Sequence, residues 1–413
     1  MAKLQGFKML TNVDEALKVW LNAWSVKQFD CVVLPLVDVC GRILAEDVVA
    51  LVDLPCFARS AMDGYAVRYI DCLNASQLCP VRLEIISVGE VAVGQAKQIW
   101  TGNPLPDGAD AVVMLEHTVC NGNILEISCP LVPNVNVIPC GDDVKKGQIV
   151  AKAGTRLNPY VIGLAAALGF SSLKVYRKPV VALLATGNEI VAVGTMAGAH
   201  QIFDSNKLML SAMCNELGAE TIDFGIVKDN VEEISEKIRQ ALMVSDALIT
   251  TGGTSVGGLD LVPEAVNSVG KPGVIVHGLA LRPAMPTGVA VLNDKPIMIL
   301  SGNPVASIVG FEVLGRPAVC RLLGLSRVES RFVLSAVLSR KVSGFLGRRT
   351  YVRVLVKFSM GALIVEPVSA KGSSSISTMT KSNGYVIIPE NREGLTEGET
   401  ILVQMFGGIE IDV

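Results

Sequence analysis

The stretch Thr250-Thr251-Gly252-Gly253-Thr254-Ser255-Val256-Gly257-Gly258-Leu259-Asp260 directly follows a short apolar segment, and the rest of the chain is organised around it. It contains four glycines, three threonines, one serine and a final carboxylate. Glycines let a backbone approach a ligand, and clustered N–H groups and hydroxyls bind phosphate. A carboxylate beside them suits Mg²⁺. An ordinary glycine-rich turn explains the same residues, since neither a Walker loop nor a G-x-G-x-x-G motif is present.

Residues 178–325 alternate between strand-like and helix-like patterns. Asn230 followed by Glu233 resembles a capping box, and apolar residues then recur at spacings of three and four, which is typical of an amphipathic helix. The alternation predicts a mostly parallel sheet with helices on both faces. The expected strands cover residues 180–185, 219–227, 247–250, 274–277 and 296–300.

Polar and glycine-rich segments follow several of these strands. They are Thr186–Glu189, Asp229, the 250–260 loop with Asp260, and Ser301–Asn303. The carboxyl ends of strands in an open α/β sheet form the ligand crevice. Turns and helix caps explain each segment singly but not their shared edge. The pattern therefore predicts a site for phosphate and a metal, with carboxylates from Glu189, Asp229 and Asp260.

The other segments predict additional domains around this doubly wound α/β domain, and a length of 413 residues predicts roughly three domains in all. Short strand-like runs separated by Pro, Gly and Asn predict an inserted β domain, and the last part of the chain predicts a β-barrel-like domain. The expected boundaries are 1–47 with 141–178 for a discontinuous mixed α/β linker domain, 48–140 for the inserted β domain, 179–327 for the α/β domain and 328–413 for the C-terminal β domain.

Composition excludes several classes of function. The chain has 36 basic and 39 acidic residues and no basic stretch, so its sequence does not indicate a nucleic-acid-binding surface. Its apolar runs, such as 161–170, are well short of the roughly 20 residues that span a bilayer. We expect a cytoplasmic protein with free thiols, because the first residues do not resemble a secretory signal and the ten cysteines form no C-x-x-C pair. No Ser–His–Asp set indicates covalent catalysis.

Five motifs in order carry a family resemblance. They are Ser60-Ala-Met-Asp-Gly-Tyr-Ala66, Thr101-Gly-Asn-Pro-Leu-Pro-Asp-Gly-Ala-Asp-Ala-Val-Val113, Thr186-Gly-Asn-Glu189, Gly252-Gly-Thr-Ser-Val-Gly257 with Asp260, and Ser301-Gly-Asn-Pro-Val305. Together they resemble molybdopterin molybdenumtransferase, the MoeA family that includes the E domain of gephyrin. The resemblance covers nearly the whole chain. The first two motifs are long and specific, whereas the others are shared with the single-domain adenylyltransferase of the same pathway.

The resemblance implies a homodimer of four-domain subunits. Such an enzyme inserts molybdate into the dithiolene of adenylated molybdopterin, with Mg²⁺, and releases AMP. The partners implied are molybdopterin adenylyltransferase and apo-molybdoenzymes. A scaffold or peptide-binding role of the gephyrin type, a tungstate-inserting homologue, and a single-sheet nucleotide hydrolase with unrelated β appendages are the alternatives.

The resemblance also implies roles for individual residues. The catalytic set is Asp63, Thr101, Glu189, Asp229 and Asp260, and the metal-binding set is Glu189, Asp229 and Asp260. Asp63 and Thr101 of the partner subunit would close the cleft. The substrate-binding set is Thr186, Gly187, Gly252, Gly253, Thr254, Ser255, Gly257, Arg282, Ser301, Gly302, Asn303, Pro304, Ser373 and Ser374.

The chain departs from the family pattern at three places. Asn188 stands where most bacterial members carry Asp, and Arg282-Pro-Ala-Met-Pro286 stands where many carry Lys-Pro-Gly-Lys-Pro. Arg282 keeps the first cation and can hold an anion bidentately, whereas Met285 loses the second. Ile138-Pro-Cys140 also replaces residues that are often basic. These changes predict weaker anion capture, or a preference for tungstate.

Overall fold

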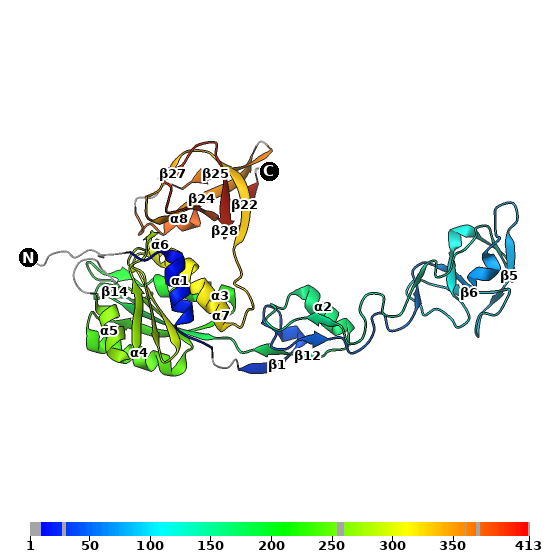
Figure 1. Ribbon diagram of the computed structural model, residues 1–413, viewed down its shortest axis with the longest axis horizontal. Coiled ribbons are helices and arrows are strands. Elements are labelled where there is room, and N and C mark those ends of the chain that lie inside the picture. The colour runs from blue at the N-terminus through cyan, green and yellow to red at the C-terminus, as the bar shows by residue number, and fades with distance from the viewer. Residues whose placement is uncertain (1–9, 27–29, 254–259, 360, 369–371, 412–413) are drawn as a thin grey trace, which may run out of the picture. The chain divides into compact units, whose positions relative to one another are not determined.

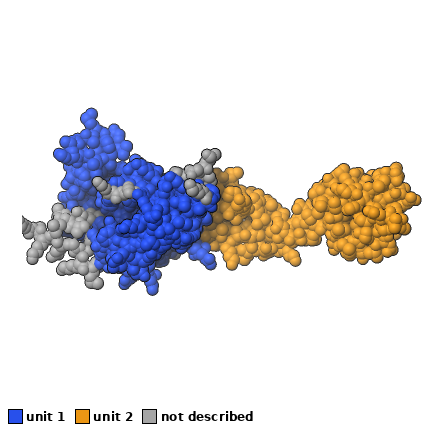
Figure 2. Space-filling view, turned by 90° about the horizontal axis from the view of Figure 1, so that it is seen from above, with its two compact units in different colours: residues 1–32, 176–413 blue, residues 33–175 orange. Residues whose placement is uncertain are grey.

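The computed structural model describes residues 10–26, 30–253, 260–359, 361–368 and 372–411. The chain forms two compact units (Figures 1 and 2), one of residues 33–175 and one of residues 1–32 with 176–413. Each unit has hydrophobic clusters of its own. In the described part of the chain, no helix is long and apolar enough to cross a lipid bilayer. The division into four domains stays a prediction.

The larger unit contains a six-stranded sheet in the order β16-β13-β17-β21-β20-β18. The first four strands are parallel, and β20 pairs antiparallel with both β21 and β18, so β18 runs in the same direction as the first four. The predicted doubly wound α/β class is confirmed, although the sequence pattern did not predict β20. The strands are β13 (Val180–Thr186), β16 (Glu220–Val227), β17 (Ala247–Thr251), β18 (Pro272–His277), β20 (Gly288–Leu292) and β21 (Lys295–Leu300).

Helices cover both faces of this sheet (Figure 1). On one face α4 and α5 bury Ile234, Ile238 and Val262 against alternate strand residues. Asn230 caps α4 as predicted, since its side chain accepts a hydrogen bond from the Glu233 N–H at 2.9 Å. The helices are α1 (Val13–Asn22), α3 (Asn206–Leu217), α4 (Val231–Val244), α5 (Leu261–Val269), α6 (Pro304–Gly310) and α7 (Arg316–Leu322), with a π-helical segment (Phe311–Gly315) between the last two. The short strands β14 (Ile190–Val191) and β15 (Ile202–Phe203) precede α3.

The C-terminal part of the larger unit is a closed β structure. Strand β24 pairs with both β25 and β26, β28 pairs with both β22 and β26, and β22 pairs with β25, so the sheet closes on itself. The predicted barrel-like domain is therefore confirmed. Its elements are β22 (Phe332–Leu338), β23 (Val342–Ser343), β24 (Arg349–Ser359), β25 (Ala362–Pro367), α8 (Ser377–Thr380), β26 (Gly384–Ile388), β27 (Gly394–Leu395), β28 (Thr400–Met405) and β29 (Glu410–Ile411).

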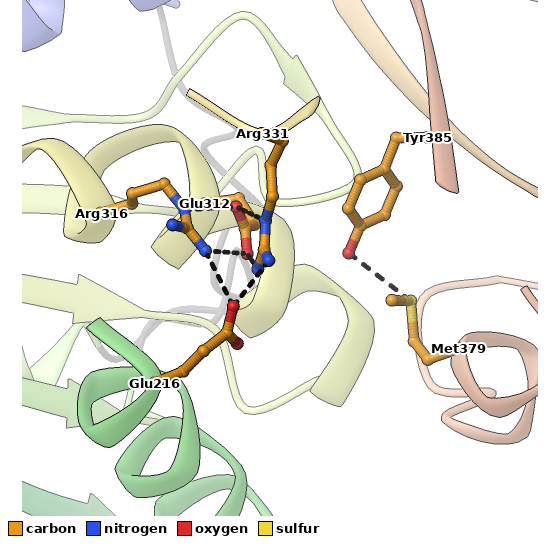
Figure 3. A network of polar contacts seen from close by, with 6 residues as sticks. All are labelled: Glu216, Glu312, Arg316, Arg331, Met379 and Tyr385. Atoms are coloured by element: carbon orange, nitrogen blue, oxygen red, sulfur yellow. Dashed lines mark hydrogen bonds and ion pairs between the residues drawn. The ribbon is translucent and has the colours of Figure 1, made fainter. Parts of the chain in front are cut away.

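Two features join this domain to the α/β part. Strand β19 (Leu281–Arg282) pairs with the start of β24. Arg331, directly before β22, binds Glu312 of the π-helical segment at 2.6 Å and Glu216 of α3 at 2.7 Å (Figure 3). Arg316 of α7 also binds Glu312, at 2.9 Å. The chain therefore enters the C-terminal domain through an ion network anchored on two helical segments.

The smaller unit contains a six-stranded sheet in the order β7-β4-β6-β5-β9-β8. A core that includes Leu83, Leu125 and Ile127 packs on it. A second core includes Leu44, Leu157 and Ala165 of α2 (Pro159–Ala167), which Asn158 caps. The strands are β1 (Cys31–Pro35), β2 (Val48–Val49), β3 (Arg59–Ser60), β4 (Gly64–Val67), β5 (Val81–Ile86), β6 (Gln95–Ile99), β7 (Ala111–Met114), β8 (Thr118–Asn121), β9 (Ile124–Ile127), β10 (Val137–Ile138), β11 (Ile149–Ala151) and β12 (Ser172–Tyr176).

Candidate functional site

A cavity of about 420 Å³ lies at the carboxyl ends of β13, β17 and β21. Strand β16 lies on one side of β13 and the later strand β17 on the other, so the chain changes direction across the sheet at this point. Open α/β sheets bind ligands at such a point. The structure thus brings together these predicted residues in the cavity lining: Thr186, Glu189, Gly252, Gly253, Ser301, Gly302, Asn303 and Pro304. Gly187, between Thr186 and the cavity-lining Glu189, is not itself in the lining.

Gly252 holds two strand ends close together. Its N–H donates to the Leu300 carbonyl at 3.2 Å. Its φ is +88°, and a Cβ there would lie 2.2 Å from the Thr186 carbonyl oxygen. Only glycine combines this φ with so close an approach of two backbones. The loop after β17 therefore stays directly beside the loop after β13.

The Ser301–Asn303 segment forms another wall and leads into α6. The Asn303 N–H donates to Ser301 Oγ at 3.3 Å, and the Ser307 hydroxyl donates to the Ser301 carbonyl. Asn206 Nδ2 donates to the Gly302 carbonyl at 2.8 Å. These bonds fix the loop and present its hydroxyl and amide groups at the cavity.

Sequence reasoning missed one wall of this cavity. Ile190, Ile202, Phe203, Asp204, Ser205 and Asn206 also line it. The segment 204–206 is polar and leads from a strand into a helix. The other loops of the site were identified from the same kind of polar connection. Strand β15, which precedes it, is only two residues long and too short to predict.

The three predicted metal carboxylates are all exposed. Glu189 lines the cavity, and Asp229 is held beside the same loop because Asn188 and Asp229 exchange two hydrogen bonds of 3.3 Å. Asp260 precedes α5, and its charge acts on His277: burial lowers the pKa of His277 and Asp260 opposes that effect.

These carboxylates suit Mg²⁺ better than a metal that needs an all-protein cage. Among the described residues, no three His, Cys, Asp or Glu side chains are grouped so as to hold a metal. Mg²⁺ takes only one or two carboxylates, with waters and substrate phosphates as its other ligands. The donor set therefore fits Mg²⁺ that arrives with a phosphorylated substrate.

Asp63 and Thr101 lie together in the smaller unit. Asp63 Oδ1 accepts hydrogen bonds from the Thr101 N–H and the Thr101 hydroxyl, both at 2.7 Å. These bonds hold the pKa of Asp63 below its usual value, so the exposed carboxylate is charged. Their catalytic role stays a prediction. Thr254, Ser255 and Gly257 lie outside the described residues.

A second cavity, of about 440 Å³, adjoins the first and shares Pro286, Ser301 and Asn303 with it. The C-terminal domain forms its opposite wall. Ser373 lines it and accepts a hydrogen bond from the Val305 N–H at 3.1 Å, whereas Ser374 is not in the lining. The described lining residues include three cations and no carboxylate: Arg282, Arg348 and Arg353.

The charges of this cavity are poorly compensated. Burial lowers the pKa of Arg282, and the neighbouring Arg348 charge lowers it further. Burial also lowers the pKa of Arg353, whose Nε is buried with no hydrogen-bond partner among the described residues. Partly desolvated guanidinium groups bind anions strongly, and a tetrahedral oxyanion can accept two of their hydrogen bonds at once.

Comparison with known proteins gives the family. The chain is 36% identical over 403 residues to the molybdopterin molybdenumtransferase of Bacillus subtilis, across 95% of this chain and 93% of that protein. The chain belongs to the MoeA family. Three family profiles match in succession: the MoeA N-terminal region (domain I and II) at residues 11–169, the probable molybdopterin binding domain at 182–321, and the MoeA C-terminal region (domain IV) at 335–406.

Other MoeA relatives match over similar lengths. A putative molybdopterin biosynthesis protein of Methanocaldococcus jannaschii is 39% identical over 380 residues, which are 90% of this chain and 91% of that protein. The crystal structure of the molybdopterin biosynthesis MoeA protein from Pyrococcus horikosii superposes with a TM-score of 0.81 and 33% identity, covering 97% of this chain and all of that one.

Two of the predicted departures from the family pattern lie in or beside the cavities. Asn188 precedes the cavity-lining Glu189, and its side-chain oxygen accepts a hydrogen bond from the Asp229 N–H. Met285 lines the second cavity without a charge, so the cations there come from Arg282 and from the C-terminal domain.

Proposed function

We propose that this MoeA-family chain is a molybdopterin molybdenumtransferase, which inserts molybdate into adenylated molybdopterin and releases AMP. One observation carries the proposal: a cavity lined by glycines, hydroxyls and amides adjoins a cavity lined by arginines, and the two share Ser301 and Asn303. The first suits a phosphorylated substrate and the second an oxyanion. The names of the relatives agree with this pair of ligands.

In the first cavity, the loops at Gly252–Gly253 and Ser301–Asn303 bind and orient the phosphates of adenylated molybdopterin. Mg²⁺ would be held by one or two of the carboxylates Glu189, Asp229 and Asp260, with substrate phosphates and waters as its other ligands. When bound, Mg²⁺ supplies positive charge that allows phosphate and molybdate to approach each other. Gly252 keeps the loops after β13 and β17 together, so the phosphates meet a fixed set of donors.

In the second cavity, Arg282, Arg348 and Arg353 attract and hold molybdate or tungstate. Ser301 and Asn303 border both cavities, so the oxyanion is held directly beside the pterin nucleotide. Holding two reactants in contact removes much of the entropic barrier to their reaction. Molybdopterin adenylyltransferase as the supplier of the nucleotide and apo-molybdoenzymes as acceptors of the product stay predictions.

A direct assay tests the proposal. Purified protein with adenylated molybdopterin, Mg²⁺ and molybdate should release AMP and yield a cofactor that activates an apo-molybdoenzyme. Tungstate in place of molybdate tests which oxyanion is preferred. Absence of AMP release with either oxyanion would remove the enzymatic proposal.

Glu189→Gln and Asp260→Asn should each raise the Mg²⁺ concentration needed for half-maximal AMP release by about tenfold, because a neutral amide is a weaker Mg²⁺ ligand. Both side chains are exposed, so the melting temperature should stay within a degree or two of wild type. A Mg²⁺ titration of activity, with a thermal melt of each variant, measures both effects. An unchanged Mg²⁺ dependence in both variants contradicts the metal assignment.

We further propose that the enzyme is a homodimer in which Asp63 of the partner subunit completes each site. At the Mg²⁺ concentration that gives half-maximal activity in wild type, Asp63→Asn and Glu189→Gln should each lose most activity when made alone. Mixing the two variants with subunit exchange should restore about a quarter of the wild-type activity, since half the dimers are mixed and each has one intact site. If the mixture is shown to contain mixed dimers but its activity does not recover, Asp63 acts in the site of its own subunit.

A further inference from the structure

We propose that Phe345 is a positioning residue for the oxyanion, because its ring holds the Arg282 guanidinium at the second cavity. The Arg282 Cζ atom lies 3.7 Å from the centroid of the Phe345 ring, a close cation–π contact. The inference rests on the proposed function, in which Arg282 binds molybdate. It gives Phe345, an exposed aromatic residue that does not line the cavity, a part in that binding.

Arg282 needs such a partner. It is exposed, its side chain makes no ion pair or hydrogen bond with the described part of the chain, and Arg348 nearby repels it. An arginine side chain with several rotatable bonds loses binding energy when it must be ordered at the moment of binding. A contact that orders it beforehand therefore increases affinity for the anion.

The short contact leaves the guanidinium available to a ligand. With Cζ only 3.7 Å from the ring centroid, the ring covers one face of the planar guanidinium, and the N–H donors lie in its plane. A tetrahedral oxyanion in the cavity can then accept two of these hydrogen bonds at once. Phe345 thus restrains the cation without competing for its donors.

The turn that carries Phe345 is itself well fixed. The Arg348 N–H donates to the Phe345 carbonyl at 3.1 Å, and the Arg349 N–H then donates to the Ala280 carbonyl at 2.9 Å. The Arg349 guanidinium binds Asp14 at 2.6 Å and Glu390 at 3.1 Å. The same turn therefore positions Arg348 through the backbone and Arg282 through the ring, and it does so in a chain where Met285 supplies no second cation.

Phe345→Leu tests the inference, because it keeps an apolar side chain but removes the aromatic face. The ring is 48% exposed, so its loss leaves the core intact. The KM for molybdate should rise about three- to tenfold with kcat unchanged, as expected for a partly exposed cation–π contact. Phe345→Tyr, which keeps the face, should restore the wild-type KM. Phe358→Leu, which alters a 43% exposed ring on β24, the strand that follows the Phe345 turn, is the matched control and should change neither constant.

An Arg282→Ala background distinguishes positioning from a general structural effect. If Phe345 acts through Arg282, adding Phe345→Leu to Arg282→Ala should raise the KM no further. Additive effects, an unchanged KM in Phe345→Leu, or a fall in kcat alone would each overturn the inference.

The wild-type assay separates this inference from the proposed function. AMP release by wild type with no effect of Phe345→Leu contradicts only the positioning role. If wild type releases no AMP, the proposed function fails. Calorimetric titration of the same variants with molybdate alone then decides whether Phe345 strengthens oxyanion binding at Arg282.

Discussion

Glu312→Gln should destabilise the larger unit by about 3 kcal/mol, because it leaves the buried Arg316 and the partly buried Arg331 guanidinium groups facing a neutral amide. The Glu312 side chain is only 8% exposed and binds both Arg316 and Arg331 (Figure 3). Removing one charge of a buried pair exposes the full desolvation cost of its partners. Differential scanning calorimetry should show a lower Tm for the transition of the larger unit.

Glu216→Gln is the matched control. Glu216 contacts the same two arginines, but its side chain is 54% exposed. Solvent screens an exposed ion pair, so this change should cost less than about 1 kcal/mol. If the two variants lose the same free energy of unfolding, burial is not the reason why Glu312 stabilises the unit.

The same network predicts a pH dependence. Burial acts to raise the pKa of Glu312, but hydrogen bonds from Arg331 and Arg316 outweigh it and hold the pKa below its usual 4.5. A carboxylate with a lowered pKa in the folded state stabilises the fold above its unfolded pKa. This contribution is therefore complete at neutral pH, and it is lost as the pH falls below about 4.5 and through the lowered pKa. Glu312→Gln should remove that part of the acid sensitivity.

Gly252→Ala should reduce AMP release at saturating substrate by about 100-fold. The new Cβ would lie 2.2 Å from the Thr186 carbonyl oxygen, so one of the two strand-end loops must move. A displacement of about 1 Å in a binding site can cost that much in rate. Steady-state assays of AMP release measure the loss.

Gly225→Ala separates this displacement from simple backbone strain. Gly225 has a φ of +86°, nearly that of Gly252, but a Cβ there meets nothing within 4 Å. Both variants carry the cost of a left-handed alanine, about 1 kcal/mol. Only Gly252→Ala should lose activity, and a comparable loss in Gly225→Ala would show that strain alone is responsible.

The α/β part of the larger unit was predictable because its signals are local. Each parallel strand is a short apolar run that ends in a glycine-rich or polar turn, and Asn230 caps α4 as the sequence indicated. Parallel strands place their carboxyl ends at one edge, so the first cavity follows from the strand order.

The second cavity was not predictable from the sequence. It needs Arg282 beside Arg348 and Arg353, which are more than sixty residues later in the chain and come from a different domain. The pairing of β19 with β24 brings them together, and a two-residue strand has no recognisable pattern. The π-helical segment was also missed, because the residues around Glu312 have an ordinary helical pattern and the ion network that accompanies it spans three elements.

The division of the two cavities between domains separates two tasks of the enzyme. All described residues that line the first cavity lie between 185 and 304, whereas the second also requires residues 343–373. An α/β domain by itself would therefore keep every described residue that lines the first cavity but only part of the lining of the second. The C-terminal β domain is what adds a second cavity beside the sheet edge.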